Sequence, residues 1–222
     1  MRKKGKLTAA ILVLALALSV MFSGCGFTAP DMKISIDGKE FKLNCKVSEI
    51  LDAGFELADI DHPSHVLAGL PPLDARVVVQ EPLFIYKNGK ASHVGIYVYN
   101  KSVNQMALED CTVYAFDYDC GVFSQNANET NILKVTFNGI DFRFTDRASV
   151  LGKLEGQGFK FNAADKESFL KDGDAYSKSL VTATNLDGSS VTVYNDYTVQ
   201  TGERTVNGFD VRLGIKYDTS GM

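Results

Sequence analysis

The feature that most constrains the fold is an internal repeat. Residues 33–43 and 134–144 share one pattern, in which apolar and polar residues alternate on each side of an Asp-Gly or Asn-Gly dipeptide. This dipeptide between alternating segments is the strongest short-range signal for a β-hairpin, because a type I′ turn requires positive φ at both central residues. Each copy is therefore expected to begin with a hairpin.

The same order of elements follows each predicted hairpin. Residues 47–55 and 148–159 place apolar residues at helical spacing and end in Gly-Phe, with Asn44 and Asp146 as candidate N-caps. Three segments of β character then follow each helix: 82–90, 94–100 and 111–118 in the first copy, and 179–184, 191–195 and 209–217 in the second.

We therefore predict an α+β fold built from two tandem repeats, residues 31–125 and 132–220. Each repeat would contain a β-hairpin, a short helix and a three-stranded antiparallel continuation. Residues 124–130 form a polar joint between them. The pattern leaves open how the two repeats pack on each other.

The N-terminus predicts an export signal over residues 1–24. Four cations lie within the first six residues, and only two polar residues interrupt the apolar run at positions 7–22. As a helix, this run of 16 residues would be about 24 Å long, which is shorter than the ~30 Å hydrocarbon core of a bilayer. It has the character of a signal peptide and not of a membrane span.

The residues Ser23, Gly24 and Cys25, which follow this run, resemble the lipobox of bacterial lipoproteins. The resemblance implies that Cys25 carries the lipid, becomes the mature N-terminus and holds the protein at the extracytoplasmic face of the cell membrane. Stable anchoring needs more than one acyl chain, which a lipobox cysteine provides. The alternative is an ordinary secretory signal peptide followed by a free cysteine.

Three further features resemble a class of small Gram-positive surface lipoproteins of unknown role. They are the Gly-x-x-Phe hairpin at Gly38, the helix that ends at Gly54, and the Asp-Cys-x-Val sequence that begins at Asp110. The tandem arrangement of a helix and a sheet also resembles the architecture of the β-lactamase inhibitor protein, an analogy of fold that carries no functional residue across.

The net charge of the exported part argues against some classes of binding partner. Removing the four N-terminal cations from the total of 23 leaves 19 Lys and Arg against 27 Asp and Glu, a net charge of −8. An acidic body argues against nucleic acid and against direct adhesion to anionic lipid, both of which are bound chiefly through Lys and Arg. Membrane attachment is then expected to depend on Cys25 alone.

The remaining cysteines leave two arrangements open. Cys45, Cys111 and Cys120 are odd in number. Export permits disulfides, so one pair could form, but we favour buried free thiols, because free Cys packs as a small hydrophobic residue.

The sequence offers little for catalysis or cofactor binding. It contains no Gly-x-Ser-x-Gly motif, so we expect no enzymatic activity, and we expect no cofactor. Metal-capable side chains gather only at Asp59, Asp61, His62 and His65, but Pro63 prevents a regular helix that would direct both imidazoles to one point. We therefore expect a solvated loop there and no metal site.

Tyrosines on two predicted strands are the candidate binding residues. Strict alternation places Tyr97 and Tyr99 on one face of their strand, and Tyr114, Phe116 and Tyr118 on one face of the next. If this face is exposed, Tyr97, Tyr99, Tyr114 and Tyr118 form a platform for a sugar ring or a peptide. If it packs on the second repeat, they are core.

These observations lead to one functional hypothesis and two alternatives. The hypothesis is a membrane-anchored, non-enzymatic surface lipoprotein that binds a protein or a cell-wall glycan. The first alternative is a sensory or regulatory lipoprotein that binds a metal through residues 59–65. The second is an envelope hydrolase.

Overall fold

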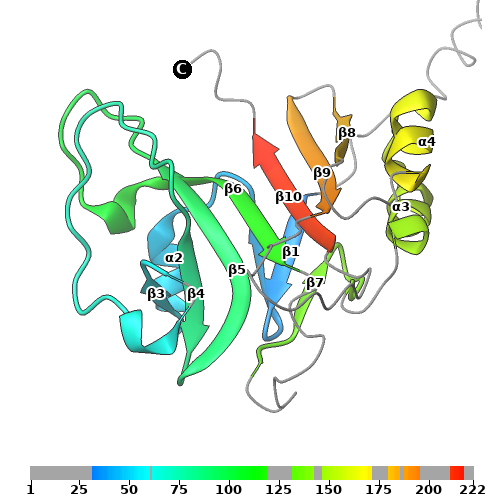
Figure 1. The fold of residues 1–222 in the computed structure, drawn as a ribbon. Coiled ribbons are helices and arrows are strands. Elements are labelled where there is room, and N and C mark those ends of the chain that lie inside the picture. The colour runs from blue at the N-terminus through cyan, green and yellow to red at the C-terminus, as the bar shows by residue number, and fades with distance from the viewer. Residues whose placement is uncertain are drawn as a thin grey trace, which may run out of the picture.

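The computed structural model describes residues 32–60, 62–119, 132–142, 147–171, 180–185, 188–195 and 211–217. Within these ranges the chain combines helices with antiparallel sheets, so the predicted α+β class is confirmed (Figure 1). The predicted signal peptide, the lipidation site Cys25 and the thiol of Cys120 lie outside the described residues.

A small sheet has the strand order β2-β1-β7, with β1 spanning Lys33–Ile36, β2 Lys39–Lys42 and β7 Val135–Phe137. Both predicted turns are present. Asp37 and Gly38 have φ values of 50° and 78°, and Asn138 and Gly139 have 47° and 80°. These are the positive angles that a type I′ turn requires.

A large sheet has the strand order β3-β4-β5-β6-β10-β9-β8. Its strands are β3 (Glu56–Ala58), β4 (Leu83–Lys87), β5 (Lys90–Tyr99), β6 (Thr112–Asp119), β8 (Leu180–Thr184), β9 (Ser189–Asn195) and β10 (Val211–Tyr217). The last strand of each half, β6 and β10, pair antiparallel at the centre of the sheet (Figure 1). In the small sheet, the first strand of each half, β1 and β7, also pair antiparallel.

The first helix, α2 (Val47–Asp52), starts later than its predicted cap. Asn44 has a φ of 68° and lies in a turn, so it is not the N-cap. The chain enters the helix at Lys46, whose backbone N–H donates to Glu49 Oε1 at 2.8 Å. Gly54, with φ of 81°, follows the helix end as predicted.

In the described residues of the second half the helices are α3 (Arg147–Gly156) and α4 (Ala163–Lys171). Gly158, with φ of 96°, follows α3 as predicted, whereas the candidate cap Asp146 lies outside the described residues. Helix α4 is not predicted by the repeat. Asn162 caps it, because its Oδ1 accepts from the backbone N–H groups of Ala164 and Asp165 at 2.9 and 3.2 Å. The short 3₁₀ turns η1 (Pro63–His65) and η2 (Leu108–Asp110) lie in the first half.

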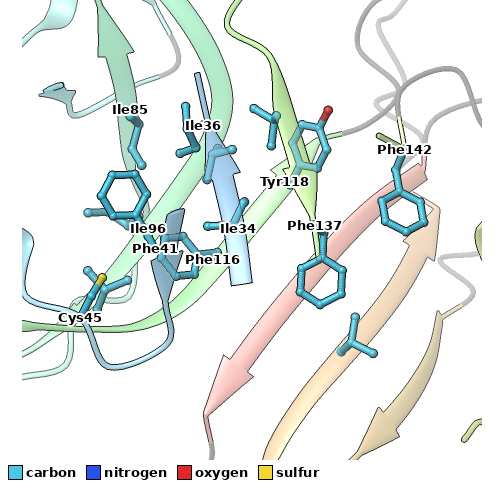
Figure 2. Close-up of a cluster of buried hydrophobic side chains, with 14 of the residues drawn as sticks. Ile34, Ile36, Phe41, Cys45, Ile85, Ile96, Phe116, Tyr118, Phe137 and Phe142 are labelled. Atoms are coloured by element: carbon cyan, nitrogen blue, oxygen red, sulfur yellow. The ribbon is translucent and has the colours of Figure 1, made fainter. Parts of the chain in front are cut away.

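One hydrophobic core crosses both halves. Figure 2 shows Ile34, Ile36 and Phe116 of the first half close to Phe137 and Phe142 of the second. All five side chains are at most 1% exposed. Burial of each large apolar side chain stabilises the fold by about 1.5–3 kcal/mol, so this shared cluster joins the two halves.

A β-bulge interrupts the pairing of β5 with β6. Tyr97 pairs with Ala115, and Val98, the next residue of β5, pairs with Val113. Tyr114 is therefore an extra residue in β6. A bulge of this kind shifts the alternation of side chains by one position.

The bulge changes which residues of β6 share a face. Val113 and Phe116, three positions apart, both belong to the core, as does Tyr118. Tyr114 belongs to a separate cluster on the opposite face. The prediction that Tyr114, Phe116 and Tyr118 share a face is wrong, because it assumed an uninterrupted strand.

Candidate functional site

Two irregular segments, residues 66–82 and 100–107, are joined by backbone hydrogen bonds and form a double loop. These segments lead into β4 and out of β5, and they project beyond the large sheet on the side of α2 (Figure 1). Leu73 and Met106 exchange two backbone hydrogen bonds, at 2.8 and 3.0 Å, which tie the segments together. The double loop is therefore held in one conformation well beyond the ends of the strands.

Asn100 organises the base of the double loop. Asn100 is fully buried, and its Nδ2 lies 2.9 Å from each of the backbone oxygens of Leu73, Asp74 and Asn104, so its two hydrogens are shared among three acceptors. Its Oδ1 accepts from the backbone N–H of Ser102 at 2.8 Å. Buried backbone carbonyls need hydrogen-bond partners, and this one amide provides partners to carbonyls of both segments.

Backbone hydrogen bonds continue the sheet into the double loop. The N–H of Val79 donates to the oxygen of Val98 at 2.9 Å, and the N–H of Asn100 donates to the oxygen of Val77 at 3.0 Å. Arg76 turns the chain with a φ of 59°, a left-handed conformation that is costly for a residue with a side chain.

The double loop exposes apolar side chains although it is well ordered. Val103 is 69% exposed and Val77 is 37% exposed. The residues around Val103 are fixed by the hydrogen bond from the Asn104 N–H to Ser102 Oγ at 3.0 Å. Gln105 Nε2 also donates to Asp74 Oδ1 at 3.1 Å. The arrangement presents two valines to solvent on a fixed backbone.

Next to the double loop lies a cluster of tyrosines. Tyr99 and Tyr114 are 3% and 7% exposed and pack with Val78 and Tyr97. The rings of Tyr97 and Tyr114 lie 6.1 Å apart, and the Tyr114 hydroxyl donates to the backbone oxygen of Val79 at 3.3 Å. Burial raises the pKa of Tyr114 above its ordinary value. These contacts join the cluster to the double loop.

The four candidate tyrosines do not form one platform. Tyr118 is fully buried on the opposite face of the sheet, inside the core shared with the second half. Tyr99 and Tyr114 are too buried to stack on a ligand, and only Tyr97 is partly exposed. Among the four tyrosines, only Tyr118 belongs to the core shared with the second half, and Tyr99 and Tyr114 are instead buried in a separate cluster with Val78.

The histidine segment is an exposed turn. His62 Nδ1 lies 2.6 Å from the Ser64 hydroxyl oxygen and accepts a hydrogen bond from the Ser64 backbone N–H at 3.3 Å. His65 Nδ1 lies 3.3 Å from Asp59 Oδ1, and both side chains are about half exposed. Asp61 lies outside the described residues. Within the part of the chain that the structure describes, no group of three or more His, Cys, Asp or Glu side chains could hold a metal ion.

Cys45 and Cys111 are buried free thiols. Burial raises the pKa of Cys45 to about 12, with a smaller contribution from the Glu49 carboxylate. Burial also raises the pKa of Cys111, with Asp110 adding to the effect. The thiolate is the reactive form of cysteine, so both side chains are poor nucleophiles at neutral pH.

Sequence reasoning missed the double loop and its residues Asn100, Val77 and Val103. One available signal was that the predicted β segment 94–100 ends in Asn100, because a polar amide directly after a buried strand often satisfies backbone groups. The two exposed valines carried no signal, since Val is common in any strand or loop.

Comparison with known proteins returns no match: no protein-family profile fits the chain, and neither the curated proteins nor the solved structures contain a significantly similar one. Among the described helices, none has the length and apolar character needed to cross a bilayer.

Proposed function

We propose that this chain is a lipoprotein, anchored through Cys25 at the extracytoplasmic face of the cell membrane, that binds a protein partner through its double loop. The observation that carries the proposal is the ordered exposure of Val103 and Val77. Ordering one loop residue costs about 1–2 kcal/mol, and the Asn100 hydrogen bonds offset this cost. Binding residues are found disproportionately on loops that a rigid scaffold positions.

Action by binding, without catalysis, is supported by the reactivity of the candidate groups. The raised thiol pKa values of Cys45 and Cys111 make both weak nucleophiles. His62 and His65 lie in an exposed turn, where each Nδ1 contacts a neighbour from the same segment. Neither pair provides a nucleophile with an oriented base.

A protein partner is favoured over a cell-wall glycan. Sugar rings bind to exposed aromatic faces, but Tyr99, Tyr114 and Tyr118 are at most 7% exposed. The exposed valines of the double loop instead suit an apolar surface on another protein. The net charge of −8 for the exported part continues to argue against nucleic acid.

The two halves are proposed to be copies of one unit, residues 31–125 and 132–220. Support comes from the strand order, in which β6 neighbours β10 and β1 neighbours β7. Each pairing joins strands from corresponding positions of the two halves, and each is antiparallel. Two copies related by a local two-fold axis would produce this arrangement.

The anchor is tested by mass spectrometry of the mature N-terminus. We expect an N-terminal peptide that begins at Cys25 and carries acyl chains, and we expect the Cys25→Ala variant to lose the lipid and leave the membrane fraction. An unmodified wild-type chain outside the membrane fraction would contradict the anchor and leave the double loop untouched.

The binding surface is tested with a photo-crosslinking residue at position 103 of the full chain in intact cells. We expect one defined envelope protein to be crosslinked, and we expect Val77→Asp to reduce the yield strongly, because a buried unpaired carboxylate is costly. The matched control places the crosslinker at exposed Lys90, the first residue of β5. Equal products from both positions would contradict a binding role for the double loop.

A further inference from the structure

Three of the four outer strands of the two sheets are protected against pairing with another chain. Strand β2 carries Lys39, Glu40 and Lys42. Strands β3 and β7 have only three residues each, and Ala58 of β3 also forms a bridge with Val66. Charged residues, short length and coverage are the usual devices that keep a sheet edge from recruiting another strand.

Strand β8 has none of these devices. It is five residues long, its sequence is Leu-Val-Thr-Ala-Thr, and it contains neither charge nor proline. Leu180, at its start, is 58% exposed. Figure 1 shows β8 as the outermost strand at its end of the large sheet, close to α4.

The backbone of β8 presents hydrogen-bonding groups outward. The N–H of Asn185 donates to Ser189 at 2.7 Å, which fixes the register of β8 with β9. Hydrogen-bonded pairs alternate in an antiparallel ladder, so Ala183 and Val181 bond to β9, whereas the N–H groups of Leu180, Thr182 and Thr184 point away from it.

Helix α4 packs against one face of β8. Phe169 of α4 is 1% exposed and belongs to the core cluster that contains Val181 and Ala183. Side chains that point toward α4 lie perpendicular to the plane of the ladder. Among the described residues, no strand pairs with the outer edge of β8.

We propose that β8 is a self-association site, where the β8 strand of a second copy of this chain adds antiparallel and joins the two large sheets into one. In the symmetric register, Thr182 lies opposite Thr182 of the second copy, and Leu180 lies opposite Thr184. The pairing covers the exposed Leu180 and satisfies the outward backbone groups of both copies.

A second copy fits this edge better than an unrelated strand does. The edge has no charge with which to select a charged partner, and for the same reason two identical edges meet without repulsion. The proposed pairs are also favourable across two strands: threonine opposite threonine, and the apolar Leu180 opposite the β-branched Thr184. A strand that pairs with itself also gives a closed two-fold dimer, the commonest form of oligomer.

The first test is disulfide trapping in the full chain. A cysteine at position 182 would meet its own counterpart at about 5.5 Å between Cα atoms, within the range for a disulfide. We expect Thr182→Cys to give a covalent dimer under mild oxidation. The matched control, Leu180→Cys, faces Thr184 and is expected to stay monomeric, as is the wild-type chain.

The second test measures the mass of the detergent-solubilised full chain by light scattering. We expect twice the monomer mass for the wild type, and loss of the dimer in Leu180→Lys, because a charge at an exposed edge opposes pairing without entering the core. The proposal is overturned by a wild-type monomer or by a dimer that persists in Leu180→Lys. It is also overturned if the crosslinked product of the Thr182→Cys variant has a mass that shows another protein in place of a second copy.

Discussion

Asn100 is a single side chain on which two chain segments depend. The two hydrogens of its amide are shared among three backbone oxygens, each 2.9 Å from Nδ2, and its own oxygen accepts one further hydrogen bond. We expect Asn100→Asp to lower the free energy of unfolding by about 2–4 kcal/mol, because a carboxylate would replace the donor and face carbonyl oxygens without one. Urea denaturation measures the change.

The control for this prediction is Asn104→Asp, a change of the same chemistry at an exposed residue of the double loop. It should stay within about 0.5 kcal/mol of the wild type, as most surface substitutions do. Equal stability of the Asn100 and Asn104 variants would show that the buried amide does not organise the double loop.

Cys45 makes stability depend on pH in the alkaline range. Its pKa is raised from 9.0 to about 12 in the folded protein, so the unfolded chain loses the thiol proton first as the pH rises. The stabilising contribution is complete below pH 9 and decreases between about pH 9 and pH 12, by up to about 1.4 kcal/mol per pH unit.

Replacing Cys45 with Val should therefore flatten the alkaline decline of the free energy of unfolding, measured by urea titration at a series of pH values. Tyr114 and Cys111 shift in the same direction, so part of the decline will remain. A variant whose decline matches that of the wild type would contradict the assignment to Cys45.

At the scale of elements, close approach of β5 to the double loop depends on Gly95. A Cβ atom added there would lie 2.7 Å from Cβ of Pro82, closer than real Cβ atoms approach. We expect Gly95→Ala to destabilise the protein by about 1–3 kcal/mol through overpacking. Thermal unfolding followed by circular dichroism measures this.

Gly152, inside α3, provides the opposite control. A Cβ there would meet nothing within 4 Å, and alanine is about 1 kcal/mol more favourable than glycine in a helix interior. Gly152→Ala should raise the melting temperature while Gly95→Ala lowers it. Changes of the same sign would contradict the close approach of Pro82 to Gly95.

The elements also show where sequence patterns succeed. Both hairpin turns and both Gly-Phe helix ends were predicted, because positive φ at Asp37-Gly38 or Gly54 is a local property of the chain. The shared face of Tyr114 and Tyr118 was predicted wrongly, because the bulge in β6 depends on pairing with β5. Strand β3 was missed because three residues are too few to show a period.

At the scale of the whole molecule, the two halves are expected to unfold together. The ladders β1–β7 and β6–β10 both cross between the halves, and Tyr118 and Phe137 share one core. Differential scanning calorimetry should therefore give a single transition whose calorimetric and van't Hoff enthalpies agree. Two resolved transitions would show that each half folds as an independent domain.

The sequence by itself determined the local elements: the turns, the glycines that end the helices, and the α+β class. Only the tertiary structure decided that the halves share one core, that Tyr118 faces it while Tyr114 does not, and that Asn100 fixes a loop with exposed valines. The physical reason is the separation along the chain over which the interactions act. Turn and cap preferences act within a few residues, whereas burial and strand register depend on residues that lie far apart in the chain.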